Sequence, residues 1–225
     1  MGHDDLFRKR KARTSTALQR RKRERERSKR YLIVCEGTKT EPQYLRELLH
    51  DLRIRPQLVR VAPNDGASPD RVVAHALSLY DEDALTGDVF DQVYCMFDRD
   101  RHSTFDGAVT RVKDLAAAGK PFAAITSTPC FEVWLLLHFR YSDQPFHAAG
   151  RKSVGDQVVS VLRTMPGFEK YGKGQKGVYG KLKEKLANAF IHAERLRRQG
   201  ATIGSINPAT NVDELIRAIQ ALAIR

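Results

Sequence analysis

Long apolar runs, cysteines and nucleotide-binding glycine loops are the features that this sequence has little of. In its 225 residues, 41% of them hydrophobic, no apolar run approaches the about 20 residues that a membrane-spanning helix needs. The first residues also lack the apolar core of a secretory signal. We therefore expect a soluble protein of the cytoplasm that has no contact with a membrane.

The three cysteines, Cys35, Cys95 and Cys130, are separated by 60 and 35 residues, and this spacing fits no zinc site. We interpret them as small buried hydrophobic side chains in a reducing compartment. The sequence contains no GxxxxGK[ST] phosphate loop, and no Ser-His-Asp order stands out. If the protein depends on ATP hydrolysis, that activity is expected from another chain.

Acidic residues are scarce in residues 1–30, which hold 13 lysines and arginines and four acids, a net +9 of the formal +12. The rest of the chain is nearly balanced, so residues 1–29 are predicted to form a basic, flexible arm. Such arms bind polyanions through counterion release, without reading sequence. We expect nucleic-acid contacts from Arg20, Arg21, Lys22 and Arg23; the alternative is a solvated tail that binds nothing.

The chain is organised around residues 31–49, which read YLIVCEGTKTEPQYLRELL. Residues 31–35 form an apolar run short enough to be a buried strand, and Glu36 and Gly37 end it. Gly37 allows a backbone geometry that other residues resist. The residues from Thr38 onward are typical of a helix start. A carboxylate at the tip of a strand suits a metal cation better than a phosphate.

A second stretch, VYCMFDRDRH, repeats this pattern, since residues 93–97 are predicted to form a buried strand that ends in Asp98, Arg99 and Asp100. Side chains two apart on an extended chain face one way, so Asp98 and Asp100 point to the same side. In a parallel sheet both tips lie on the carboxyl edge, where open α/β sheets bind ligands. Glu36, Asp98 and Asp100 would then hold Mg²⁺ or Mn²⁺; the alternative is that they are solubilising turn residues.

The rest of the pattern alternates strands and helices up to about residue 128 and is helical beyond it. Strands are predicted at 57–62 and 122–126, and helices after residue 68 and at 105–118. Further helices are predicted within 127–139 and at 154–165, 178–199 and 212–224, with a glycine-lysine loop at 166–177. This favours an α/β fold: a parallel sheet flanked by helices (residues 30–128) with a mainly helical extension (129–225) packed on it.

Four more residues are candidates for the same site, each with an ordinary structural alternative. Glu41 could add a carboxylate, or could complete a capping box that starts at Thr38. Glu132 is either a ligand of a second metal or a helix-start acid, and its apolar surroundings make an unpartnered charge costly. Lys173 and Lys176 could grip a scissile phosphate from the glycine-lysine loop, or could be solvated.

The segments CEGTKTE, FDRD and STPCFEVWLLLHF, with YGKG and NPAT further on, resemble the RloB family. Proteins of that family look like members of the Toprim superfamily, in which a glutamate follows the first strand and an Asp-x-Asp pair follows a later one. That pattern maps onto Glu36, Asp98 and Asp100. The resemblance implies a Toprim-like fold, Mg²⁺-dependent phosphoryl transfer, and a role beside an ATPase of AAA or ABC type in restriction or anti-phage systems.

We therefore expect a metal-dependent nuclease of anti-phage or abortive-infection defence, with Glu132 and Lys173 catalytic beside the metal ligands. One rival is a non-catalytic module that docks on an ATPase, and another is a nucleotidyl transferase that uses the same carboxylates. Either DNA or RNA fits these features as the substrate. The glycine-lysine loop is expected to be mobile until substrate or a partner orders it.

Overall fold

The structure is a computed structural model, and it describes residues 28–64, 68–99, 103–204 and 206–223. In these residues the chain forms a five-stranded sheet with the order β2-β1-β3-β4-β5. Four strands pair in parallel, namely β1 (Tyr31–Cys35), β2 (Val59–Pro63), β3 (Gln92–Asp98) and β4 (Phe122–Thr128). The fifth, β5 (Ala209–Thr210), pairs antiparallel with β4. The prediction of a Toprim-like α/β fold with a parallel sheet is confirmed.

The central strands β1 and β3 are apolar because both of their faces are covered. Tyr31 and Ile33 of β1 belong to one hydrophobic core, whereas Leu32 and Val34 belong to the core on the other face of the sheet. Parallel strands buried on both faces read as continuous apolar runs rather than as alternating patterns. The same rule accounts for residues 93–97, all of which are buried.

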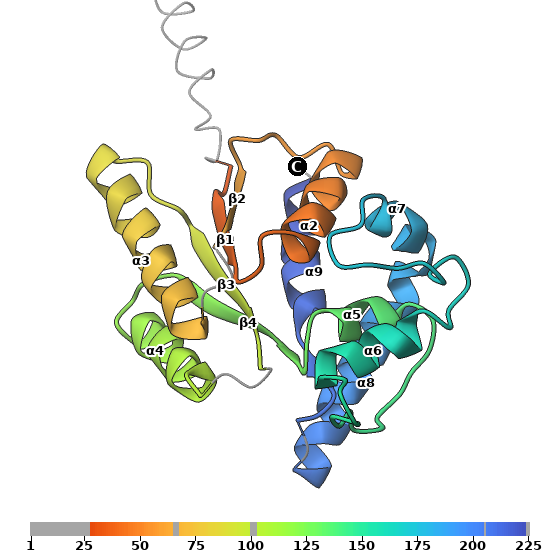
Figure 1. Cartoon of the computed structure of the whole chain (residues 1–225). Coiled ribbons are helices and arrows are strands. Elements are labelled where there is room, and N and C mark those ends of the chain that lie inside the picture. The colour runs from red at the N-terminus through yellow and green to blue at the C-terminus, as the bar shows by residue number, and fades with distance from the viewer. Residues whose placement is uncertain (1–27, 65–67, 100–102, 205, 224–225) are drawn as a thin grey trace, which may run out of the picture.

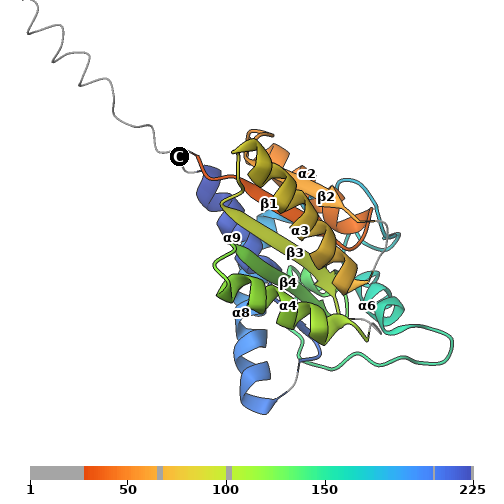
Figure 2. The same cartoon turned by 90° about the vertical axis from the view of Figure 1, so that its left-hand side faces the viewer.

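Helices cover both faces of the sheet (Figures 1 and 2). Helices α3 (Pro69–Thr86) and α4 (Phe105–Ala117) lie on one side, and α2 (Thr40–Asp51) lies on the other with the C-terminal helices. These are α5 (Glu132–Leu137), α6 (Val154–Leu162), α7 (Val178–Leu182), α8 (Leu186–Ile203) and α9 (Val212–Ala223). They share one continuous core with α2 and the sheet. No helix within the described residues has both the length and the apolar character to cross a membrane.

Strand β4 runs two residues beyond its predicted end at residue 126, before the helix predicted within 127–139 begins. Ser127 and Thr128 continue strand β4 and pair with Thr210 and Ala209 of β5, and α5 starts at Glu132. The Ser127 and Thr210 hydroxyls are 3.1 Å apart and share a buried hydrogen bond. Strand β5 was not predicted, because two residues are too short to show a strand period.

The single helix predicted at 178–199 is divided into two. A 3-10 turn, Lys183–Lys185, separates α7 from α8. The division lets α7 pack along α2 while α8 packs against α5, β5 and α9. The hydrophobic period continues through the break, since Leu182 and Leu186 are both buried, and so the pattern alone predicts one helix.

A buried ion pair joins the last elements of the fold. Asp213, in the first turn of α9, is 1% exposed and accepts hydrogen bonds from both terminal nitrogens of Arg197 on α8. Arg197 Nη1 also donates to the Thr210 carbonyl at 2.9 Å. One guanidinium group therefore holds α8, β5 and α9 together.

We predict that Arg197→Ala lowers the free energy of unfolding by about 3 kcal/mol, because it leaves the Asp213 carboxylate buried without its partner. The control is Arg198→Ala on the same helix, whose side chain is 79% exposed and pairs with Glu194; it should cost less than about 1 kcal/mol. Urea unfolding measures both changes. Equal losses would contradict the importance of the Arg197–Asp213 pair.

Candidate active site

The carboxyl ends of β1 and β3 lie side by side and carry Glu36 and Asp98. The parallel ladder continues to Glu36, whose backbone N–H donates to the Met96 carbonyl at 2.9 Å. The Glu36 side chain reaches the neighbouring strand, where its Oε2 accepts a hydrogen bond from the Asp98 N–H at 2.9 Å. The structure thus brings Glu36 and Asp98 together at the carboxyl edge of the sheet.

Asp98, the last residue of β3, is held from the other side by the start of α5. Its Oδ2 accepts a hydrogen bond from the Phe131 N–H at 3.1 Å. Burial raises the pKa of Asp98 well above its usual range, and repulsion from Glu41, Glu132 and Glu36 raises it further. The Asp98 carboxylate is therefore surrounded by groups of its own charge.

Glu41 lies in the first turn of α2, close to the tip of β1. A Cβ atom at Gly37 would lie 2.6 Å from Glu41 Oε2, so a larger residue at position 37 would displace this carboxylate. Burial raises the pKa of Glu41 to about 7. Repulsion by Glu132 and Glu36 acts in the same direction, while its own backbone N–H and Lys173 act in the opposite direction.

The capping box considered for Glu41 is not formed. Lys39, rather than Thr38, occupies the N-cap position of α2, and no side chain caps the first turn. Glu41 is therefore placed by its closeness to the other carboxylates and to Gly37, and not by a cap.

Glu132 opens helix α5 and is buried, with 1% of its surface exposed. The Tyr171 hydroxyl donates to Glu132 Oε1 at 3.2 Å, and Lys173 Nζ lies 3.7 Å from Oε2. A charge in so apolar a segment would be costly without such partners. Both partners come from the glycine-lysine loop, so this loop completes the site.

Lys173 supplies positive charge beside the carboxylates. Burial lowers its pKa, but attraction by Glu132, and then by Asp98 and Glu41, raises the pKa above its usual value overall, so the ammonium group stays protonated at neutral pH. The Lys173 side chain is nevertheless 58% exposed. The same ammonium group is held by Glu132 and accessible to a ligand.

The loop that carries Lys173 is fastened along α2 by its own backbone. The Gly174 N–H donates to Thr40 Oγ1 at 3.0 Å, and the Gly177 N–H donates to Glu47 Oε1 at 2.6 Å. This differs from the expectation of a mobile loop that waits for a partner, because the contacts that hold it come from the chain itself.

One protein-family model, described as RloB-like protein, matches residues 31–219. The chain belongs to the RloB-like family. The matched region contains all the elements that supply the site residues described above, and it begins after the basic arm of residues 1–29. No curated protein and no solved structure matches the chain.

Several predicted residues of this RloB-like chain lie outside the described part of the structure. These are Asp100 and the arm residues Arg20, Arg21, Lys22 and Arg23. Lys176 is described, and it is exposed on the glycine-lysine loop. Among the described residues, no group of three or more His, Cys, Asp or Glu side chains is arranged so that it could hold a metal ion as it stands.

Two supporting residues of the RloB-like site were missed from the sequence. Tyr171, 1% exposed, holds Glu132, and Thr40, 8% exposed, holds the loop through Gly174. For Tyr171 the YGKG segment offered only its closeness in sequence to Lys173 as a signal, because an irregular loop has no side-chain period. Thr40 gave no such signal, because its partner is distant in sequence.

The carboxylates of the site fit a hard divalent cation by their chemistry. Glu36, Glu41, Asp98 and Glu132 offer carboxylate oxygens, the donors that Mg²⁺ and Mn²⁺ prefer. The raised pKa values of Glu41 and Asp98 reflect, besides burial, the mutual repulsion of these groups. A cation among them would relieve that repulsion.

We predict that Glu41 destabilises the metal-free protein at neutral pH. Its pKa in the folded protein, about 7, exceeds the ordinary value of 4.5, so folding favours the protonated carboxyl group. The stability that the protonated group contributes is fully present below about pH 4.5 and is lost as the pH rises through 7. In EDTA above about pH 7.5, Glu41→Gln should raise the free energy of unfolding by roughly 2–3 kcal/mol. Near pH 4.5 the variant and the wild type should be almost equally stable.

The control for this comparison is Glu194→Gln, which changes an exposed glutamate of α8. It should alter stability by less than about 1 kcal/mol at either pH. Denaturant unfolding across this pH range measures all three proteins. The same pH dependence in Glu41→Gln as in the wild type would show that the penalty comes from another group.

Proposed function

We propose that this protein is a nuclease that hydrolyses phosphodiester bonds with Mg²⁺ or Mn²⁺. The observation that carries the proposal is the convergence of Glu36, Glu41, Asp98 and Glu132, with the ammonium group of Lys173, at one edge of a parallel sheet. Carboxylates alone repel a phosphodiester, so a site of this composition suits a polyanion only when a cation is bound as well.

Each side chain has a distinct role in this proposal. Glu36, Glu41 and Asp98 would hold the cation, with Asp100 as a further candidate ligand. When bound, such a cation polarises the phosphodiester and lowers the pKa of a coordinated water. Lys173 would stabilise the negative charge that develops on the phosphate oxygens. Glu132 orients the ammonium group from 3.7 Å.

Membership of the RloB-like family, together with the resemblance described above, supports a biological role in anti-phage or abortive-infection defence. On this proposal the protein acts in the cytoplasm beside an ATPase of AAA or ABC type. The absence of a GxxxxGK[ST] loop from the sequence is in keeping with ATP hydrolysis by a separate chain. The basic arm would add sequence-independent contacts to the nucleic acid.

We predict that Asp98→Asn abolishes metal-dependent cleavage and leaves the fold intact. An asparagine oxygen can still accept the hydrogen bond from the Phe131 N–H, and loss of the charge relieves repulsion, so the melting temperature should stay the same or rise slightly. Cleavage of labelled single-stranded DNA and RNA, with Mg²⁺, Mn²⁺ or EDTA, measures the activity.

The control is Asp114→Asn, an exposed position of α4, which should cleave like the wild type. Calorimetry with Mg²⁺ and Mn²⁺ tests the metal directly. Cleavage that persists in Asp98→Asn would refute this site, and a wild-type protein that binds no metal would favour a non-catalytic docking module.

We also predict that Lys173→Ala lowers kcat by about 100-fold, the usual effect of removing one group that stabilises transition-state charge. KM should change much less, because other cations contribute to substrate binding. Lys170→Ala, at an exposed position of the same loop, is the matched control and should keep its activity. An equal fall in both variants would point to the loop as a whole rather than to the Lys173 ammonium group.

A further inference from the structure

One face of helix α2 carries a stripe of basic and polar side chains that leads away from the carboxylates. The stripe consists of four residues at spacings of four, three and four, which places them on one side of the helix: Lys39, Gln43, Arg46 and His50. The stripe begins beside the first turn, which contains Glu41, and ends in the last turn. With a rise of 1.5 Å per residue, it is about 16 Å long.

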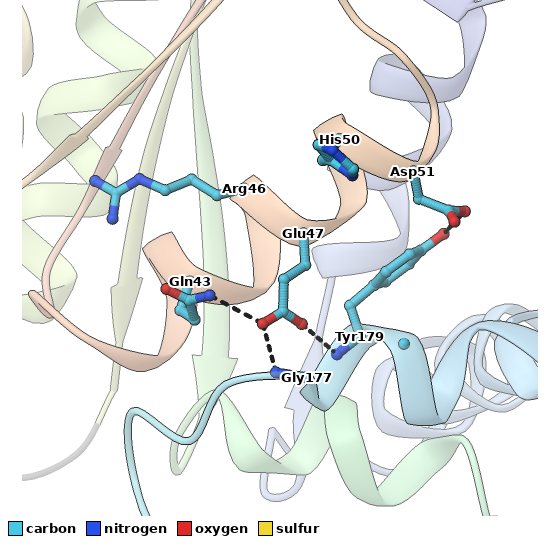
Figure 3. A pocket seen from close by; sticks show the side chains of 8 residues that line it. Gln43, Arg46, Glu47, His50, Asp51, Gly177 and Tyr179 are labelled. Atoms are coloured by element: carbon cyan, nitrogen blue, oxygen red, sulfur yellow. Dashed lines mark hydrogen bonds between the residues drawn. The ribbon is translucent and has the colours of Figure 1, made fainter.

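The glycine-lysine loop and helix α7 run along this stripe and form a second wall. Gly174 lies so close to α2 that a Cβ atom there would be 2.9 Å from Lys39 Cβ. Further along, Glu47 accepts hydrogen bonds from the N–H groups of Gly177 and Tyr179, at 2.6 and 3.0 Å (Figure 3). The loop therefore follows α2 away from the carboxylates.

Between these two walls lies a cavity of about 420 Å³. Its volume falls within the range of small-ligand sites in proteins. It is lined by residues of α2 and of the segment around α7, namely Gln43, Arg46, Glu47, His50, Asp51, Gly177, Tyr179 and Gly180. We call this cavity, with the flanking Lys39 and Lys176, the α2–α7 groove.

The acidic side chains of the groove are bound by neighbouring groups of the groove itself. Glu47 accepts the two backbone hydrogen bonds of α7 and a third from Gln43 Nε2 at 2.9 Å. Asp51 pairs with Lys183 Nζ at 3.1 Å and accepts from the Tyr179 hydroxyl at 3.3 Å. These carboxylates therefore hold the two walls together, and Lys183 offsets the charge of Asp51.

The basic side chains of the groove are not engaged in this way. Arg46 and Lys176 are exposed, and neither side chain forms an ion pair or a hydrogen bond with another described residue. Figure 3 shows Glu47 and Asp51 turned toward α7, and Arg46 turned away from it. Among the described residues, Arg46 and Lys176 therefore leave their positive charges available to a ligand at the groove.

We propose that the α2–α7 groove binds the phosphodiester backbone of the substrate strand next to the scissile phosphate. Arg46 contacts the phosphates from the rim of the groove, where its side chain turns away from α7, and Lys176 contacts them from the loop, with Lys39 at the end near the carboxylates. This inference rests on the proposed nuclease function and adds the path by which the strand leaves the site. Recognition is by charge, so DNA and RNA strands both fit.

The test is binding by the full chain in EDTA, where no cleavage is required. Fluorescence anisotropy with labelled single-stranded DNA and RNA gives the affinity over a range of salt concentrations. Arg46→Ala and Lys176→Ala should each lower the slope of log affinity against log salt by about 0.7, the value for one phosphate contact to a single strand. The double variant should bind about tenfold more weakly at moderate salt.

The controls are Arg111→Ala and Lys113→Ala, exposed cations of α4 on the other side of the sheet (Figure 1). They remove the same charges, and they leave the slope unchanged if the groove is the contact. Arg46→Lys keeps the charge and should retain most of the affinity. The basic arm is present in every variant, so its contribution cancels.

Equal slopes in the groove variants and the α4 variants would overturn this inference. That result is separable from a failure of the proposed function. A chain that cleaves but shows no groove effect refutes only the groove, whereas one that binds through the groove but never cleaves with Mg²⁺ or Mn²⁺ refutes only the nuclease.

Discussion

The parallel pairing of β1 with β3 is the constraint on which the candidate site depends. Its register sets Cys35 beside Met96, so the next residue, Glu36, reaches the Met96 carbonyl with its N–H and the Asp98 N–H with its carboxylate. A slip of one residue would turn every side chain to the other face, and two separate cores forbid it. Apolar packing of the two strands therefore holds the carboxylates of Glu36 and Asp98 together. The free energy gained by burying the strands offsets the repulsion between these carboxylates.

The C-terminal half of the chain completes this edge of the sheet. Helix α5 delivers Glu132 into a buried position, and the glycine-lysine loop delivers Tyr171 and Lys173 to it. One lysine does not balance four carboxylates, and the pKa values of Glu41 and Asp98 stay raised in its presence. The arrangement is therefore stable as protein but electrostatically incomplete, which is the condition in which a divalent cation gains most by binding.

The sequence was most informative where one stretch of chain determines its own structure. The apolar runs that end in Glu36 and Asp98 predicted both strands and their shared edge, because a strand buried on both faces has a continuous apolar pattern. Contacts between distant segments left no such pattern. The hydrogen bond from Gly174 to Thr40, which fastens the loop, joins residues 134 positions apart. The end of β4 also depended on a distant partner, since β5 pairs with Ser127 and Thr128.

Charge also explains why the α2–α7 groove and the carboxylates fit together as one proposed site. The carboxylates would repel a phosphodiester and Lys173 would offset only part of that repulsion, whereas Arg46 and Lys176 would attract the strand nearby. A cation held by Glu36 and Asp98 would change the electrostatic potential at the scissile phosphate from negative to positive, and only there. By linkage, substrate must then raise the affinity for the cation by the same factor as the cation raises the affinity for substrate. Because the proposed groove contacts do not involve the cation, they would hold the strand with or without it, and the cation would act mainly on cleavage.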